Sequence, residues 1–343
     1  MIILVRTDAS PQIGTGHLMR CLALAQACKE RGHVPIFVFA METPLKERLR
    51  KEEIEIARIT AERGSASDAE QTISIARHWE AEWIVIDGYA FDATYSRKFR
   101  DAGFGVLMID DYAHQSTYEC DLLLNQNIDT TKEMYKDKTD ALLLLGTEYS
   151  LLRKEFLEQK ARTREISEIA TNILVTLGGG DPQNATAIVL KALDCITNSE
   201  FAVNVILGSE NPYEDELKKI IAGSKHRITL LNNITDMPPL MATADIAIAA
   251  AGSTSWELLF MGLPFITGIL AENQAGIAAK LGAEGLAVNM GWYRDVTAAS
   301  LGEKILALLK NTEARRAMSE RGKKTVDGGG AERVIAAMIS HSS

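Results

Sequence analysis

The chain has 343 residues, a length that suits two domains better than one. Hydrophobic residues make up 46% of it, and the formal net charge is −9, so we expect no general attraction to nucleic acid or to a membrane surface. No apolar run is long enough to span a membrane, and the N-terminus lacks a basic, apolar leader. The four cysteines are scattered without a C-x-x-C pair, which argues against zinc and disulfides and favours a reducing cytoplasm. We therefore expect a cytoplasmic protein with no metal, no cofactor and no obligate protein partner.

The first half of the chain alternates short apolar runs with helical patterns. We expect strands at 1–5, 34–40, 54–59, 83–86, 106–109, 122–124 and 141–145. The helices are expected at 18–30, 44–51, 67–80 and 94–102. This alternation is typical of a parallel sheet with helices on both faces.

A highly charged stretch at 155–170 separates this half from a second α/β series. We expect its strands at 173–177, 201–207, 228–231, 245–249 and 264–267. The helices are expected at 184–195, 213–222, 237–244, 256–261, from 272 onward, 298–310 and 314–326. The sequence therefore predicts an α/β protein with two Rossmann-like doubly wound domains, at 1–160 and 171–343, that face each other across a cleft.

The loop after the first strand reads Gln12-Ile-Gly-Thr-Gly-His-Leu-Met-Arg20. Gly14 and Gly16 allow close approach of a ligand to the backbone, and the helix behind them favours an anion. His17 lies at the mouth of this turn, where it could act as a general base. Two simpler interpretations remain open: the glycine turn is only structural, or His17 is only a polar helix cap. The dinucleotide-binding fingerprint is incomplete, because its third glycine position is Met19.

The carboxyl ends of parallel strands gather other polar residues at one edge of each sheet. In the first half these are Asp87, Tyr89, Asp110 and Asp111. In the second half they are Gly178, Gly179 and Gly180 in one loop, Ser253, Thr254 and Glu257 in another, and Asn273 and Gln274 in a third. Two small-residue loops that each lead into a helix suit a diphosphate.

Several of these residues have a second interpretation. Glu257 either accepts hydrogen bonds from ribose hydroxyls or completes a capping box with Thr254. The acidic pair at Asp110 and Asp111 is either a metal site or, more simply, a capped strand end. Tyr89 is either an active-site residue or a half-buried ring with a wet hydroxyl.

The motifs together resemble a known family. The stretches Arg6-Thr-Asp-Ala-Ser10, Gln12 to Arg20, Ile86-Asp-Gly-Tyr89, Ile109-Asp-Asp111, Leu177-Gly-Gly-Gly180 and Ala251-Gly-Ser-Thr-Ser-Trp-Glu257 resemble the PseG family. These enzymes hydrolyse UDP-2,4-diacetamido-2,4,6-trideoxy-β-L-altropyranose in pseudaminic acid biosynthesis. The second half is also similar to the UDP-sugar-binding half of MurG-type glycosyltransferases with the GT-B fold. Spore-coat polysaccharide proteins share the same loops.

The resemblance implies specific roles for these residues. His17 matches the general base and Tyr89 an active-site tyrosine; Glu257 and Gln274 match ribose contacts, and Ser253 and Thr254 match phosphate contacts. We expect Gly14, Gly16, Arg20, Gly178, Gly179, Gly180 and Asn273 to contribute to the same UDP-sugar site. Arg6, Asp8 or Tyr89 would orient the base or the sugar.

The expected function is hydrolysis of a UDP-linked diacetamido-trideoxy sugar to free sugar and UDP. A GT-B glycosyltransferase that uses a UDP-amino sugar for surface or spore-coat polysaccharide is the main alternative. A nicotinamide-dependent dehydrogenase with Glu42 on the ribose, and a non-catalytic nucleotide-sugar-binding protein, are two others.

Overall fold

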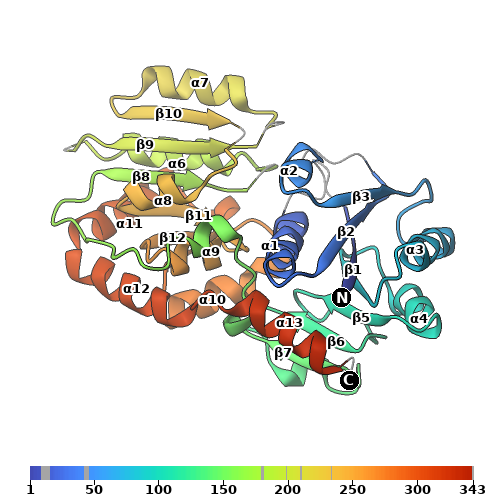
Figure 1. Ribbon diagram of the computed structural model, residues 1–343. Helices are drawn as coiled ribbons and strands as arrows, with labels where there is room; N and C mark the ends of the chain where they lie inside the picture. Colours follow the sequence, from blue (N-terminus) through green and yellow to red (C-terminus); the bar gives the residue numbers. More distant parts are fainter. Residues whose placement is uncertain are drawn as a thin grey trace. The chain divides into compact units, whose positions relative to one another are not determined.

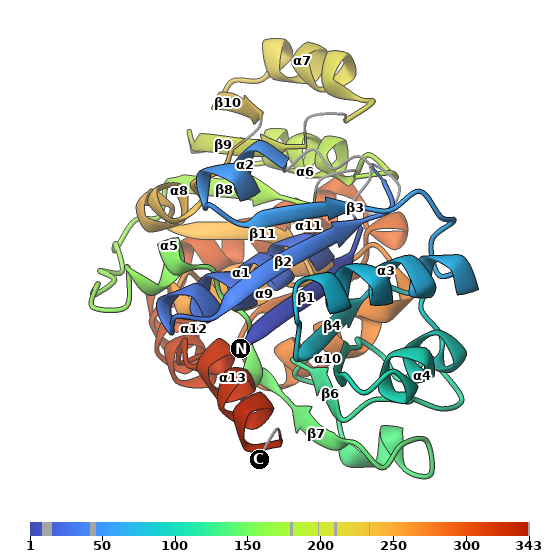
Figure 2. The same ribbon diagram turned by 45° about the vertical axis from the view of Figure 1, so that its right-hand side comes forward.

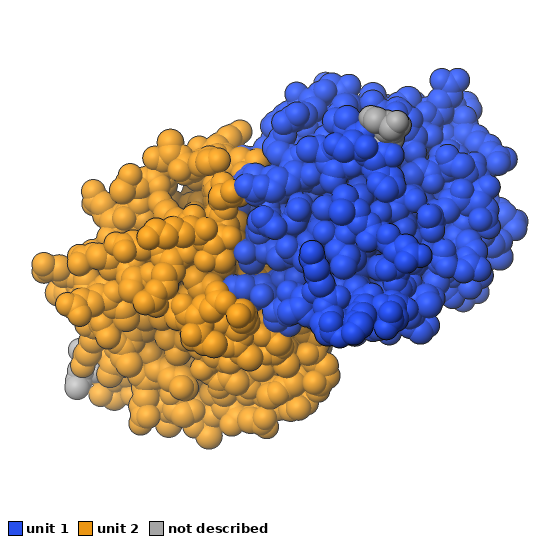
Figure 3. Space-filling model, turned by 90° about the horizontal axis from the view of Figure 1, so that it is seen from below, with its two compact units in different colours: residues 1–154, 328–343 blue, residues 155–327 orange. Residues whose placement is uncertain are grey.

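The structure is a computed structural model that describes residues 1–8, 16–41, 46–178, 181–197, 199–208, 211–232 and 234–341. Gly14, Gly179, Gly180 and Glu42, which were named above, lie outside these residues. The chain forms two compact units (Figure 3). The first unit comprises Met1–Lys154 together with Gly328–Ser343, and the second unit comprises Glu155–Asp327.

The first unit is built on a seven-stranded parallel sheet with the strand order β3-β2-β1-β4-β5-β6-β7 (Figure 1). Its strands are β1 (Ile2–Thr7), β2 (Val34–Phe39), β3 (Glu55–Arg58), β4 (Trp83–Asp87), β5 (Gly105–Ile109), β6 (Leu122–Asn125) and β7 (Leu142–Leu145). The helices are α1 (Gly16–Glu30), α2 (Lys46–Lys51), α3 (Ala66–His78), α4 (Ala93–Asp101) and α13 (Gly330–His341), with short 3₁₀ turns η1 (Lys132–Tyr135) and η2 (Thr147–Tyr149). β1 and β4 are neighbours although they are not consecutive, so the chain leaves the two strands toward opposite sides of the sheet.

Alternating side chains of these strands form two cores, one on each face of the sheet. Ile3 and Val5 of β1 pack with α1 and α13 on one face. Leu4 of the same strand packs on the other face, in the cluster that includes residues of α3 and α4. The strands are therefore buried on both sides, as expected for a doubly wound parallel sheet.

The second unit repeats this plan with a six-stranded parallel sheet in the order β10-β9-β8-β11-β12-β13. Its strands are β8 (Asn172–Thr176), β9 (Ala202–Leu207), β10 (Arg227–Asn232), β11 (Ile246–Ala250), β12 (Phe265–Ile269) and β13 (Val288–Trp292). Its helices are α6 (Ala185–Asp194), α7 (Glu214–Gly223), α8 (Pro238–Thr243), α9 (Thr254–Phe260), α10 (Ala275–Ala283), α11 (Ala298–Lys310) and α12 (Thr312–Thr325), with 3₁₀ turns η3 (Glu272–Gln274) and η4 (Tyr293–Asp295); α5 (Lys154–Leu157) lies at the junction of the units.

The predicted fold class of two doubly wound α/β domains is confirmed, but, short helical turns apart, one strand and one long helix were not predicted. β13 contains Asn289 and Gly291, which weaken its strand signal, and Gly291 has a φ of +82°. The other is α13, which packs on α1 and β6 of the first unit (Figures 1 and 2).

The observed units differ from the predicted ranges of 1–160 and 171–343. The first unit breaks after Lys154 and resumes at Gly328, and the second unit both starts and ends earlier than predicted. The junction after Lys154 lies at the start of the charged stretch. The range 171–343 is not one continuous domain, because Val334, Ile335 and Met338 of α13 are buried in the core of the first unit.

Candidate functional site

The first candidate site lies at the carboxyl edge of the first sheet, where the chain leaves β1 and β4 in opposite directions. Such a switch point is the usual place for a ligand in an open parallel sheet. α1 begins at Gly16, so His17 is in its first turn, and Asp87 is the last residue of β4. Adjacent pairing of β1 and β4 brings these two side chains together.

His17 and Asp87 form a hydrogen-bonded pair. Nδ1 of His17 lies 2.7 Å from Oδ1 of Asp87, and the two side chains are 10% and 0% exposed. An ionised carboxylate only accepts hydrogen bonds, so the proton of the neutral imidazole lies on Nδ1. Nε2 is then left as the basic nitrogen of His17.

Arg20 fixes the Asp87 carboxylate from the next turn of α1. Its Nε donates to Oδ2 and its Nη2 to Oδ1, both at 2.7 Å, and its Nη1 donates to Oδ1 of Asp111 at 2.5 Å. Burial alone would raise the pKa of Asp87, but Arg20 and His17 hold it well below its usual range. Burial would likewise raise the pKa of Asp111, but the positive charge and hydrogen bonds of Arg20 hold this pKa below its usual range. The guanidinium also lies 3.1 Å from Nδ1 of His17, a contact between two donors that follows from their shared acceptor, Asp87.

In the structure Arg20 supports the carboxylates around His17, and the substrate contact expected from the sequence stays a prediction. Its side chain is only 6% exposed, and its donors point to Asp87 and Asp111. The arginine therefore supports the carboxylate that supports His17.

Tyr89 completes the network at the surface. Its hydroxyl donates to Oδ2 of Asp111 at 2.7 Å, and its ring packs edge-on against His17 with a centroid separation of 4.9 Å. The structure thus brings together His17 and Tyr89, the two residues predicted as catalytic. Asp87 was expected at this sheet edge without a role, and Asp111 as part of either a metal site or a capped strand end; the position of both at the ends of buried strands was the available signal.

Arg6 and Asp8, by contrast, do not join this network. Arg6 is fully buried and binds Asp68 through two hydrogen bonds of 3.0 and 2.7 Å, and Asp8 through one of 2.7 Å. Asp8 also accepts from the backbone N–H of Ala40 at 3.0 Å. These contacts tie β1 to β2 and α3, so the expectation that Arg6 or Asp8 orients the base is not supported.

The contacts of Asp110 favour the capped strand end over a metal pair. Its carboxylate accepts from the backbone N–H of Ala113 at 2.7 Å and from the hydroxyls of Tyr118 and Tyr135 at 3.1 and 2.6 Å. The carboxylate oxygens of Asp111 accept hydrogen bonds from Arg20 and Tyr89. Within the described ranges, no group of three or more His, Cys, Asp or Glu side chains is placed to hold a metal ion.

The second candidate site lies at the switch point between β8 and β11 in the second unit. Gly178 follows β8 with a φ of +90°, which favours glycine. After β11, Ser253 is the N-cap of α9 and its side chain makes no capping hydrogen bond. Thr254 is thus the first helical residue and Glu257 the fourth. The capping box considered for Thr254 and Glu257 takes Thr254 as the N-cap, whereas the structure has Ser253 at that position.

Asn273 and Gln274 lie in η3, after the end of β12, and both are half-buried. Oε1 of Gln274 accepts from the backbone N–H of Leu270 at 2.9 Å, which fixes the side chain beside Gly252. Residues that follow β8, β11 and β12 are therefore placed at one edge of the sheet.

Asp181 comes after the first glycine loop and caps the helix behind it. Its two carboxylate oxygens accept from the backbone N–H groups of Ala185 and Thr186 at 2.8 and 2.9 Å. The first turn of α6 is thus already capped by an acidic side chain, although burial raises the pKa of Asp181. Of the two helix starts expected to face a diphosphate, the start of α9 is the better candidate.

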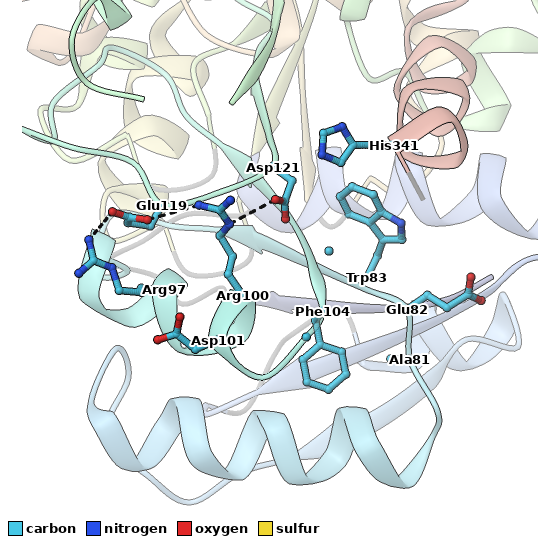
Figure 4. A pocket seen from close by; sticks show the side chains of 12 residues that line it. Ala81, Glu82, Trp83, Arg97, Arg100, Asp101, Phe104, Glu119, Asp121 and His341 are labelled. Atoms are coloured by element: carbon cyan, nitrogen blue, oxygen red, sulfur yellow. Dashed lines mark hydrogen bonds and ion pairs between the residues drawn. The ribbon is translucent and has the colours of Figure 1, made fainter. Parts of the chain in front are cut away.

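A cavity of about 920 Å³ lies at the opposite, amino-terminal edge of the first sheet (Figure 4). Trp83 and Gly105, which begin β4 and β5, line it together with Asp121. Arg100 crosses its rim to Asp121 at 3.2 Å and Glu119 at 3.4 Å. Asp87 ends the strand that Trp83 begins, so this cavity does not belong to the His17 site.

No helix in the described parts of the chain is long and apolar enough to cross a membrane.

Residues 172–333 match the glycosyltransferase family 28 C-terminal domain. An uncharacterized protein of Methanocaldococcus jannaschii, MJ1062, is 26% identical over 80% of this chain, and the chain covers 56% of that protein's length.

Two further relatives match over most of their length. The spore coat polysaccharide biosynthesis protein SpsG of Bacillus subtilis is 22% identical over 96% of this chain and 95% of its own. The UDP-2,4-diacetamido-2,4,6-trideoxy-β-L-altropyranose hydrolase of Campylobacter jejuni is 24% identical over 84% of this chain and 98% of its own.

Solved structures show the fold of the whole chain. MurG of Acinetobacter baumannii matches with a TM-score of 0.68 and 14% identity over 99% of both chains. A glycosyltransferase of Rickettsia africae matches with a TM-score of 0.69 and 14% identity over 99% of this chain and 98% of its own. The fold is therefore of the GT-B class, and the resemblance to the hydrolase, to the spore-coat protein and to the MurG-type enzymes is confirmed.

Proposed function

We propose that this protein is an enzyme that acts on a nucleotide sugar, and specifically a hydrolase that cleaves a UDP-linked diacetamido-trideoxy sugar to the free sugar and UDP. The observation that carries this proposal is the His17–Asp87 pair beside Tyr89 at the switch point of the first sheet. The similarity to the Campylobacter jejuni hydrolase supports the choice of substrate.

In the proposed reaction His17 is the general base. Asp87 accepts the Nδ1 proton, so Nε2 is available to take a proton from water. The oxygen of that water attacks the anomeric carbon, and the bond between this carbon and the diphosphate oxygen breaks. UDP leaves with the bonding electron pair, and the proton is held on His17 beside the negative charge of Asp87. Tyr89, anchored on Asp111, would orient the sugar or the water.

The nucleotide is assigned to the second unit. The backbone at the start of α9, with Ser253 and Thr254, would bind the diphosphate. Glu257, one turn further along α9, would accept hydrogen bonds from the ribose hydroxyls. Gly178, Asn273 and Gln274 would complete this contact set, and Gly16 would let the substrate approach the start of α1. No metal ligand is required in this scheme, because the helix N-terminus would stabilise the leaving diphosphate.

The proposed place of the enzyme is nonulosonic (pseudaminic) acid biosynthesis in the cytoplasm. A glycosyltransferase reaction with a UDP-amino sugar is the second candidate, and two observations favour it: the family 28 match over residues 172–333 and the similarity to the spore-coat protein. In that case His17 would activate an acceptor hydroxyl instead of water.

One experiment separates the two candidates. The purified protein is incubated with a panel of UDP-sugars, with and without EDTA, and UDP release is measured in the absence of any acceptor. A hydrolase releases UDP and free sugar from the diacetamido-trideoxy substrate at a rate that EDTA does not change. Release that depends on an added acceptor sugar would favour the transferase, and release that requires magnesium or manganese would contradict the metal-free scheme.

A further inference from the structure

Three aromatic side chains form a continuous surface beside His17, which we call the aromatic face: Tyr89, Tyr112 and His114. The Tyr89 ring lies 5.5 Å from both Tyr112 and His114, and Tyr112 stacks on His114 at 4.8 Å with an interplanar angle of 29°. Tyr89 and Tyr112 are 46% and 41% exposed, so both rings are accessible from solvent. The face is contiguous with the proposed base, since Tyr89 also packs on His17.

The loop that carries Tyr112 and His114 is held in place from the protein side. Asp110 accepts from the backbone N–H of Ala113 at 2.7 Å and lies 3.1 Å from Nδ1 of His114. Ala113 has a φ of +52°, a conformation rare for a residue with a side chain, and its carbonyl accepts from Nζ of Lys138 at 2.7 Å. This tight turn places residues 112 and 114 side by side, where their rings stack on each other.

We propose that the aromatic face binds the pyranose ring of the substrate and selects sugars that carry apolar groups. This inference rests on the proposed function. A deoxy sugar with acetamido groups presents methyl groups and C–H bonds that pack well on tyrosine rings. Tyrosine provides such contact area at a small entropic cost, because it has few rotatable bonds. A fully hydroxylated hexose would instead lose hydrogen bonds to water against this surface.

The state of the nearby carboxylates favours an uncharged group of the ligand on the aromatic face. The carboxylates nearest the face are held by protein donors: Asp111 by Arg20 and Tyr89, and Asp110 by Ala113, Tyr118 and Tyr135. The rings themselves therefore make the contact, and Tyr112 is the residue whose removal tests the idea with the least effect on His17.

The test measures binding in a His17→Asn background, so that the ligand is not consumed. Dissociation constants for UDP, the UDP-diacetamido-trideoxy sugar and UDP-glucose are compared by calorimetry. Tyr112→Ala should weaken binding of the diacetamido sugar about three- to ten-fold and leave UDP and UDP-glucose unchanged. Tyr112→Phe should bind like the parent, because the ring and not the hydroxyl makes the contact. Leu142→Ala is the matched control, since Leu142 is 51% exposed at the first residue of β7.

Two results would overturn the inference: undiminished binding of the diacetamido sugar to Tyr112→Ala, or an equal loss for all three ligands. A failure of the proposed reaction is recognised separately. In that case the protein with His17 intact still prefers the diacetamido sugar over UDP-glucose, but it releases no UDP.

Discussion

Replacement of Asp87 by Asn tests whether this carboxylate orients the proposed base. Asp87 is fully buried and makes 2.7 Å hydrogen bonds to His17 and, through two atoms, to Arg20. A hydrogen bond to a charged partner contributes about 1.5–3 kcal/mol, so its loss in the transition state should lower kcat by at least about 10- to 150-fold. An Asn amide can also donate to Nδ1, which moves the imidazole proton to Nε2 and extends the loss toward ~10⁴-fold.

Asp68→Asn is the matched control for Asp87→Asn. Asp68 is also fully buried and also bonds an arginine through two oxygens, but its arginine is Arg6 and it does not contact His17. Both variants should lower the melting temperature, because each leaves a buried guanidinium with fewer partners. Steady-state UDP release and calorimetric UDP binding would be measured for both. An equal fall in kcat in the two variants, or an Asp87→Asn enzyme within about threefold of the wild type, would refute the reasoning.

Three other predictions follow from the same contacts. His17→Asn should retain UDP affinity and fold but lose about 10²–10⁴-fold in kcat, and near-normal turnover would exclude His17 as the base. Glu257→Gln should weaken UDP binding by about 1–3 kcal/mol in a titration, whereas unchanged affinity would remove Glu257 from the ribose site. The pKa values of Asp68, Asp87 and Asp111 are lowered in the folded state, so the stability that they contribute is complete above an unfolded pKa of about 4 and is lost as pH falls through the folded values. Urea unfolding between pH 7 and pH 3 should therefore show a smaller acid dependence for Asp87→Asn than for the wild type, and an identical dependence would contradict this assignment.

The sequence predicted the sheets well because buried parallel strands are continuous apolar runs between helices. It also placed His17, Asp87, Tyr89 and Asp111 at one sheet edge, since each follows a strand. It did not predict that His17 and Asp87, 70 positions apart, form a pair. That contact depends on β1 and β4 being neighbours, and strand order is a long-range property that periodicity does not contain.

Other features that the sequence did not predict have local causes. Arg20 was expected in the UDP-sugar site, and its contact with Asp87 was not predicted; in a helix Arg20 lies one turn after His17 and points to the same carboxylate. The capping-box interpretation took Thr254 as the N-cap, whereas the structure has Ser253 there, since both are good N-cap residues and the sequence cannot choose between them. The apolar spacing of α13 at Ala331, Val334, Ile335 and Met338 is visible in the sequence, but nothing in it says which unit that helix covers.

The return of α13 to the first unit has a consequence for biosynthesis. Ala331, Val334, Ile335 and Met338 are at most 4% exposed within the core that also contains β1 and α1, so the unit whose strands are translated first is completed last. Glu155–Asp327 is continuous in sequence and can fold as soon as it has left the ribosome, whereas the part of the first core that α13 covers, next to α1, stays exposed until translation reaches α13. A released chain that ends at Asp327 should therefore show a second unit protected from protease and a first unit that remains sensitive. Vectorial synthesis thus reverses the order in which the two units are completed.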